Sequence, residues 1–329
     1  MNTTNMGDYR DFSSSPSLSF SPPFDIIPAL RIRYQVILPM VTIFGILANT
    51  FTLLVATRPK LRLFHYNLYI QFLSLVDLLG FIMRLPMVFD NEYCVYSHYS
   101  MAFYMTHFGW LIVNYFRGIS SYVLVFLSLD RFTVIWFPDT FKNTKKTNVG
   151  RKRLIFITML VFLTVYIPWN CILKVSGNGH QWMQDYRIPE DQVTRSFYKA
   201  FLLYSTLVLA GFPSICVIGL NIGIAVGFFK KIYGLLDIGN NDQTAKKKLY
   251  HTIAVLALNT SYAVCCFPYM VIVLYIERDR CYSKSTYGKE TMVCLFESLS
   301  SLWSISNMVV FFLLNKDYKV ELKRCLRIY

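Results

Sequence analysis

Charged side chains stand inside long apolar runs of this chain, where chemistry rather than solubility would explain them. The runs hold the basic residues Arg84, Arg117 and Arg131 and the acidic residues Asp77, Asp130 and Glu297. A central Asp or Arg costs roughly 2.5–3.5 kcal/mol on membrane-insertion scales. Each of these charges must therefore pair with another group or line a wet cavity.

Three of these charges are expected to converge in the outer half of the bundle. Arg84 lies seven residues beyond Asp77, on the same helical face, and Arg117 and Glu297 also face inward. They could form a ligand pocket with a positive wall, or an internal Arg–Glu bridge that fixes packing. One Glu cannot neutralise two Arg, which favours the pocket. The aromatic residues near it that could contact a ligand are Trp110, Tyr204, Tyr269 and Trp303.

Asp77 has small oxygen-bearing companions at a similar depth, namely Asn49, Ser120, Ser304 and Asn307. A carboxylate inside a membrane is a candidate functional site by default. The group could hold a sodium ion or a water network, and it could equally be a structural network that joins the helices. Sequence leaves these alternatives open. No other cofactor is expected.

Motifs of the common enzyme classes are absent. The chain has no GxSxG, HExxH or Walker A pattern, and its five His residues are scattered at loops and span ends. We therefore expect a protein without catalytic residues.

The elements that must position these residues are membrane helices. The chain has 329 residues, 54% of them hydrophobic and only 16% charged, with a mean hydropathy of +0.40. A spanning helix needs about 20 mainly apolar residues. Seven runs qualify: Val36–Thr57, Asn67–Phe89, Tyr104–Ile135, Leu154–Val175, Phe201–Phe229, Thr252–Ile276 and Met292–Leu314. The predicted fold is an all-α integral membrane protein, a seven-transmembrane helix bundle.

Basic residues predict the orientation of this bundle. One set of loops, with the C-terminal segment, holds 19 Lys and Arg against 5 Asp and Glu, while the other set holds 11 of each. The basic side is expected to be cytoplasmic, which places the N-terminus outside a plasma membrane. Lys clusters split among short membrane loops fit contact with anionic lipid rather than nucleic acid.

The chain divides into a tail, a membrane domain and a final helix. Residues 1–30 are expected to be an extracellular disordered tail, and residues 31–315 the seven-transmembrane domain. Residues 316–329 alternate basic and apolar positions at helical spacing, which predicts a short amphipathic helix on the cytoplasmic membrane surface.

Four positions are candidates for covalent modification. Asn2 begins a glycosylation sequon. Cys94 and Cys281 fall in extracellular loops, where a disulfide could form, although sequence cannot supply the geometry. Cys325 follows the amphipathic stretch and is either a palmitoylation site or an unmodified thiol.

Motifs in the correct order now identify a family resemblance over essentially the whole chain. The chain resembles the rhodopsin-like (class A) G protein-coupled receptors. The matching positions, one or more per span, are Asn49, Asp77, Ser120, Asp130-Arg131-Phe132, Pro138, Pro213, Cys266, Pro268, Asn307, Phe311 and Tyr318. The resemblance implies that Asp130 holds Arg131 at rest, and that Phe132, Pro138, Cys266, Pro268, Asn307 and Phe311 belong to the coupling and switch machinery.

Several departures qualify the resemblance. Cys266 replaces a Trp, Met308 a Pro and Phe311 a Tyr, and Lys248 stands where the family has an acidic partner for Arg131. The family's usual span-three disulfide cannot form. The pattern looks like invertebrate neuropeptide receptors of the FMRFamide-receptor type.

The sequence therefore predicts a cell-surface receptor that binds an extracellular ligand, a neuropeptide by resemblance, and activates a heterotrimeric G protein. An amidated peptide could place its Arg against Glu297, whereas a small acidic metabolite could bind Arg84 and Arg117. A receptor-like protein that has lost coupling is a further alternative. A transporter or channel ranks lower, because no internal repeat is visible.

Overall fold

The structure is a computed structural model, and it describes residues 32–62, 67–89, 95–138, 148–168, 173–177, 182–186, 192–238, 243–280, 287–314 and 316–325. The N-terminal tail with Asn2, and the loop positions Cys94 and Cys281, lie outside the described residues. So do the side chains of Trp110 and Lys248, although both residues belong to helices.

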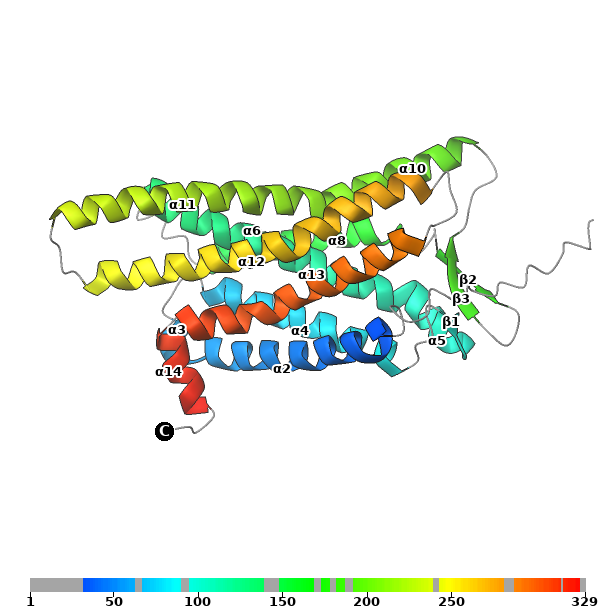
Figure 1. Ribbon diagram of the computed structural model, residues 1–329, viewed down its shortest axis with the longest axis horizontal. Coiled ribbons are helices and arrows are strands. Elements are labelled where there is room, and N and C mark those ends of the chain that lie inside the picture. Colours follow the sequence, from blue (N-terminus) through cyan, green and yellow to red (C-terminus); the bar gives the residue numbers. More distant parts are fainter. Residues whose placement is uncertain are drawn as a thin grey trace, which may run out of the picture.

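Long helices run side by side along the length of the molecule (Figure 1). Their bounds are α2 (Leu38–Ala56), α4 (Asn67–Phe89), α6 (Trp110–Trp136), α8 (Asn148–Tyr166), α10 (Gln192–Thr206), α11 (Phe212–Ile238), α12 (Gln243–Arg280) and α13 (Tyr287–Leu314). Short helices are α3 (Pro59–Arg62), α5 (Tyr99–Tyr104) and α14 (Lys316–Cys325). π-Helical segments η2 (Arg33–Ile37), η3 (Met105–Gly109) and η4 (Leu207–Gly211) adjoin α2, α6 and α11.

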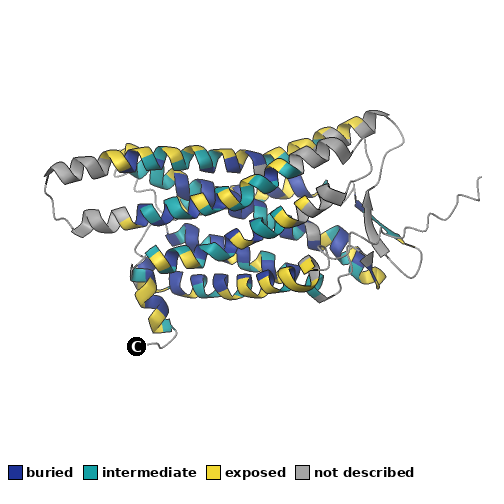
Figure 2. Ribbon diagram, viewed as in Figure 1, coloured by how far each residue is buried: buried dark blue, intermediate teal, exposed yellow. Residues whose placement is uncertain are grey.

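The helices pack as a ring. Neighbours in contact follow the order α2, α4, α6, α11, α12 and α13, and α13 returns to α2, while α8 packs against α6. Small residues let these helices approach closely, as is usual for membrane bundles. Buried and exposed residues alternate along the long helices (Figure 2). Large apolar side chains such as Phe44, Phe156 and Ile222 are exposed.

Different structures lie at the two ends of the bundle. A three-stranded antiparallel sheet of order β1-β3-β2 lies at one end, from β1 (Val95–Tyr96), β3 (Trp182–Tyr186) and β2 (Leu173–Gly177). Helix α14 turns across the other end (Figure 1). We call these the sheet end and the α14 end.

Six helical stretches among the described residues are long and apolar enough to cross a membrane: Gln35–Ala56, Asn67–Val88, Tyr99–Trp136, Phe212–Lys230, Tyr250–Ile272 and Leu295–Leu314. They correspond to six of the seven predicted spans. The remaining predicted run, Leu154–Val175, overlaps α8, which carries Arg151, Lys152 and Arg153 in its first two turns. That span stays a prediction.

The predicted end of the fourth span is wrong. Helix α8 ends at Tyr166, and Leu173–Val175 belong to strand β2 rather than to a helix. Pro168 explains the early end, because the residue before a proline is pushed out of the helical region. The sheet itself was not predicted, since an apolar run of this length does not by itself distinguish strand from helix.

Helices α6 and α11 pack so closely at Gly227 that little space is left for a side chain. A Cβ atom at this buried position would lie 2.5 Å from Ile135 Cγ2 and 2.9 Å from Trp136 Nε1. Ile135 is β-branched and has little rotamer freedom in a helix, and Trp136 Nε1 is held by donation to Gly223 O at 3.0 Å. Gly227→Ala is therefore expected to lower the unfolding free energy by about 1–3 kcal/mol, as overpacking does.

The measurement is the thermal midpoint of the purified protein, with Gly219→Ala as the control. Gly219 lies two turns earlier on α11 with nothing within 4 Å of its Cβ position. Both substitutions gain the same helix propensity, so an equal midpoint for the two variants would contradict this account of the packing.

Candidate functional site

A cavity with an empty volume of about 390 Å³ opens between α4, α6 and α13. Its apolar wall comes from Val76, Gly80, Phe81, Val113, Phe116 and Trp303, and its polar wall from Asp77, Arg84, Arg117, Ser300, Ser301 and Ser304. An apolar cleft with a few convergent polar groups is the usual form of a ligand site.

Two guanidinium groups meet at one hydroxyl in this cavity. Arg84 Nη1 donates to Ser301 Oγ at 3.0 Å, and Arg117 Nη2 donates to the same oxygen at 3.1 Å. Ser301 in turn donates to the backbone carbonyl of Glu297, one helical turn away, at 3.0 Å. Arg84 is only 6% exposed. The predicted convergence of Arg84 and Arg117 is therefore present in the structure.

The other predicted ligand-contacting residues are placed differently. Tyr269 lies beneath Arg117, whose guanidinium carbon is 5.4 Å from the ring centroid. Glu297 is half-buried on α13, one turn from Ser301, and is not among the lining residues. Tyr204 on α10 is 55% exposed and also does not line the cavity.

Ser301 is the residue that the sequence reasoning missed. A usable signal was present, because Ser301 lies four residues after Glu297 and therefore on the same helical face.

Asp77 forms the deep end of the same cavity. Ser120 Oγ donates to Asp77 Oδ1 at 2.6 Å, and Asn307 Nδ2 lies 3.4 Å from Asp77 Oδ2. Asn49 Nδ2 donates to Ser304 Oγ at 3.3 Å. The network joins α2, α4, α6 and α13, so the predicted companions of Asp77 do gather around it.

The chemistry of this network fits a hard cation. Its oxygens come from a carboxylate, hydroxyls and amides, and Asn49 Oδ1 and Asn307 Oδ1 are buried with no partner among the described residues. The described residues contain no cluster of three or more His, Cys, Asp or Glu that would suit a transition metal. Carboxylate and carbonyl oxygens suit hard cations rather than the soft metals that thiolates select.

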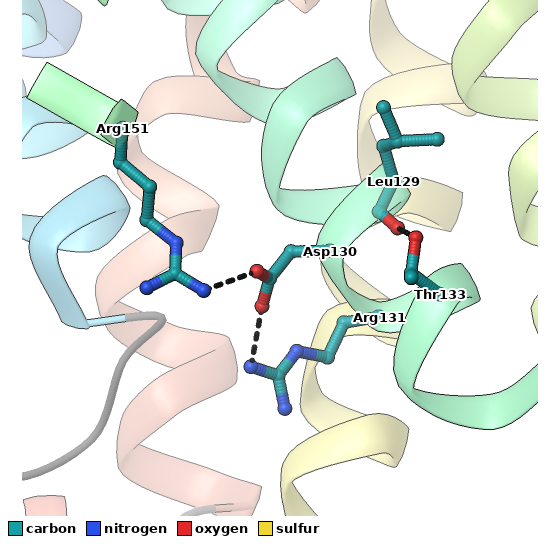
Figure 3. A network of polar contacts seen from close by, with 5 residues as sticks. All are labelled: Leu129, Asp130, Arg131, Thr133 and Arg151. Atoms are coloured by element: carbon teal, nitrogen blue, oxygen red, sulfur yellow. Dashed lines mark hydrogen bonds and ion pairs between the residues drawn. The ribbon is translucent and has the colours of Figure 1, made fainter. Parts of the chain in front are cut away.

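Asp130 at the α14 end is shared by two arginines. Arg131 Nη2 lies 3.0 Å from Asp130 Oδ2, and Arg151 Nη2 of α8 lies 2.7 Å from Asp130 Oδ1 (Figure 3). All three side chains are about nine-tenths buried. The guanidinium of Arg151 also lies 5.9 Å from the ring centroid of Tyr69. Sequence reasoning missed Arg151, because it lies across a loop from Asp130.

The arrangement around Asp130 has an energetic consequence. Removing one partner from a buried ion pair leaves an uncompensated charge, which costs about 3–5 kcal/mol. When Arg131 leaves Asp130, Arg151 still compensates the carboxylate. The second arginine therefore lowers the cost of releasing the first.

The remaining predicted switch residues lie along the bundle. Phe132 is half-buried, with its ring centroid 6.1 Å from that of Trp136, whereas Pro138 is exposed. Cys266 Sγ lies 3.9 Å from Ser300 O, and Pro268 is inside α12. Phe311 is buried with its centroid 5.9 Å from that of Tyr318.

Helix α14 is tied to the bundle from its inner face. Tyr318 is buried and donates to Thr52 Oγ1 at 3.2 Å. Arg58 Nη2 donates to the sulfur of Cys325 at 3.2 Å. Lys319, Val320 and Lys323 are exposed. These contacts fix the helix against α2 and leave its basic face open.

Comparisons with known proteins agree with this arrangement. A family model described as "Serpentine type 7TM GPCR chemoreceptor Srw" matches residues 35–329. "Probable G-protein coupled receptor B0563.6" of Caenorhabditis elegans is 26% identical over 308 residues, which cover 88% of this chain and 68% of that protein. "Probable G-protein coupled receptor AH9.1" of the same organism is 20% identical over 168 residues, which cover 50% of this chain and 40% of that protein. The chain belongs to the Srw family of serpentine G protein-coupled chemoreceptors.

Proposed function

We propose that this protein is a plasma-membrane receptor that binds an extracellular ligand in the α4/α6/α13 cavity and activates a heterotrimeric G protein. The N-terminus and the sheet end face outward, and the α14 end faces the cytoplasm. The observation that carries the proposal is the pair Arg84 and Arg117 converging on Ser301 within the cavity. Binding shifts the equilibrium toward a state in which α12 has moved outward, and only a difference in affinity between the states can do this.

The ligand presents an acidic group to the two arginines. Guanidinium groups are well suited to recognise carboxylates, because their planar donors match the two oxygens. The acidic group would belong to a small acid or to the acidic end of a peptide. The amidated neuropeptide of an FMRFamide-type, rhodopsin-like receptor remains the second candidate. That candidate is supported by motif resemblance, and Glu297 would be its contact.

The α14 end would bind the G protein. Arg131 leaves Asp130 on activation and contributes to a cytoplasmic cleft, and Arg151 keeps Asp130 compensated meanwhile.

The same proposal includes three covalent modifications and one lipid contact. They are Asn2 glycosylation, a Cys94–Cys281 disulfide, Cys325 palmitoylation and lipid contact of α14. Mass spectrometry of the membrane-purified protein tests the three modifications, and unmodified peptides at these positions would refute them. Vesicle binding of an α14 peptide that is equal with and without anionic lipid would refute the lipid contact.

Asp77, Ser120, Ser304 and Asn307 hold a sodium ion in this proposal. A ligand that binds only the folded state raises its stability with concentration. Sodium chloride is therefore expected to raise the thermal midpoint above that in choline chloride, and Asp77→Asn is expected to abolish the difference. An equal sodium effect in wild type and variant would remove the ion from this site.

Arg131→Ala is expected to abolish G protein activation while surface expression stays at the wild-type level. The reason is that Arg131 would contact the G protein directly. A G protein recruitment assay with a surface-epitope count measures both quantities. Arg153→Ala, an exposed basic residue at the same end, is the control. Normal signalling by Arg131→Ala would refute the role of Arg131 in G protein activation. A ligand-dependent current in the absence of a G protein would favour a channel instead of a receptor.

The cavity arginines decide between the two ligand classes. In a calcium or cAMP assay of small carboxylic acids and amidated peptides, Arg84→Gln and Arg117→Gln are each expected to weaken an acid by about 10–100-fold. This range corresponds to one hydrogen bond between charged groups, about 1.5–3 kcal/mol. Arg153→Gln, at an exposed basic position of α8 that does not line the cavity, should change nothing. Loss of response in Glu297→Lys with both arginine variants unaffected would favour the peptide.

A further inference from the structure

Four consecutive residues in the middle of α12 have polar side chains, Asn259, Thr260, Ser261 and Tyr262. They lie within the candidate membrane span Tyr250–Ile272. Successive residues of a helix point about 100° apart, so four of them cover most of its circumference. Such a run cannot direct all of its side chains toward a single neighbouring helix. Because polar groups within a membrane need hydrogen-bond partners, these partners must come from several sides of α12.

Each of the four side chains contacts another helix. Ser128 Oγ of α6 lies 3.0 Å from Asn259 Oδ1, which accepts from it. Asn221 Nδ2 of α11 donates to Thr260 Oγ1 at 3.1 Å.

The other two contacts complete the set. Ser261 Oγ lies 3.0 Å from Ser306 Oγ of α13, and Tyr262 OH lies 3.3 Å from Ser214 Oγ of α11. We call Asn259–Tyr262 with these four partners the polar clasp. It ties one level of α12 to α6, α11 and α13 at once.

The polar clasp is incompletely satisfied. Asn259 Nδ2 and Asn221 Oδ1 are buried with no hydrogen-bond partner among the described residues. Asn259 itself is 0% exposed. A buried polar atom without a partner is costly, and natural proteins contain few of them. A second arrangement that offered these atoms water or a new partner would therefore lie close in free energy to this one.

The polar clasp also touches the cavity. The ring of Tyr262 packs edge-on against Trp303, with centroids 5.0 Å apart and planes at 80°. Trp303 lines the cavity, and its Nε1 is another buried atom without a partner in the described part of the chain. A ligand that moves Trp303 must therefore either move the Tyr262 ring or remove the packing contact between the two rings.

We propose that the polar clasp holds α12 in its resting position, and that displacement of Trp303 by a ligand releases the clasp through Tyr262. The second half of this statement rests on the proposed receptor function, whereas the first does not. Thr260 and Ser261 are positioning residues here, because they act on α12 and touch no ligand. The clasp supplies the restraint on α12 that Lys248 cannot supply by pairing with Arg131.

The test compares Thr260→Val, Ser261→Ala and their double variant with wild type. Thr260→Val keeps the shape of an exposed side chain and removes the acceptor of Asn221. Thr164→Val is the matched control, because Thr164 is exposed and bonds only within its own helix, to Val161 O at 2.7 Å. Tyr262→Phe removes the hydroxyl contact with Ser214 and retains the ring against Trp303.

Hydrogen–deuterium exchange of ligand-free protein in nanodiscs reports the resting restraint without a G protein. Each clasp variant is expected to speed exchange in α12 about fivefold, the effect of losing one ordinary hydrogen bond, and the double variant more. Ligand-independent G protein activation should rise by a similar factor, while Thr164→Val matches wild type in both assays.

The outcomes separate the two proposals. If the clasp variants speed hydrogen–deuterium exchange in α12 but none of them activates a G protein, the polar clasp is supported and the proposed G protein coupling is refuted. Wild-type exchange and wild-type basal signalling in all the clasp variants would overturn the clasp and leave the receptor proposal intact. A ligand response that survives Tyr262→Phe and is lost in Tyr262→Leu would support the route through Trp303.

Discussion

Asp77 accepts the Ser120 hydroxyl at 2.6 Å in the middle of a bundle whose outer surface is apolar. A charge at that depth must be satisfied by protein groups or by water held in a cavity, and this requirement organises the interior. The same constraint operates at two other levels. Arg84 and Arg117 share Ser301 toward the sheet end, and Arg131 and Arg151 share Asp130 toward the α14 end. Each level joins helices that lie far apart in the sequence.

Two arginines that share one acceptor behave differently from a single arginine paired with a single acceptor. At both levels two arginines share one acceptor, and a guanidinium has five N–H groups with which it can bind several oxygens. At Ser301 both arginines line a cavity, where an acidic ligand would meet them together. At Asp130 one arginine can leave while the other still compensates the carboxylate. A buried ion pair with a single partner would resist opening far more strongly.

Sequence reasoning succeeded where the helical period and the length of an apolar run determine the structure. The predicted run Asn67–Phe89 coincides with α4, and the inward faces of Asp77, Arg84 and Arg117 follow from helical spacing alone. It failed where a partner lies across a loop or in another element. Arg151 meets Asp130, and Leu173–Gly177 pairs with Trp182–Tyr186, only in three dimensions. Tyr204 was expected near the cavity because it is aromatic, and nothing in one sequence says which side of α10 faces the lipid.

The run Asn259–Tyr262 is the most instructive of the missed features. In the sequence its first three residues form a glycosylation sequon that a membrane span would leave unused. The contacts give the run a different meaning, because its four side chains reach three neighbours of α12, namely α6, α11 and α13. In the rhodopsin-like receptors that the sequence resembles, an acidic residue pairs with the arginine at the position of Arg131, and Lys248 stands in its place here. A lysine opposite Arg131 would repel it instead of restraining it. A restraint made of neutral hydrogen bonds avoids that repulsion. It also divides the restraint among several weak contacts, so that ligand binding of modest affinity can shift the balance.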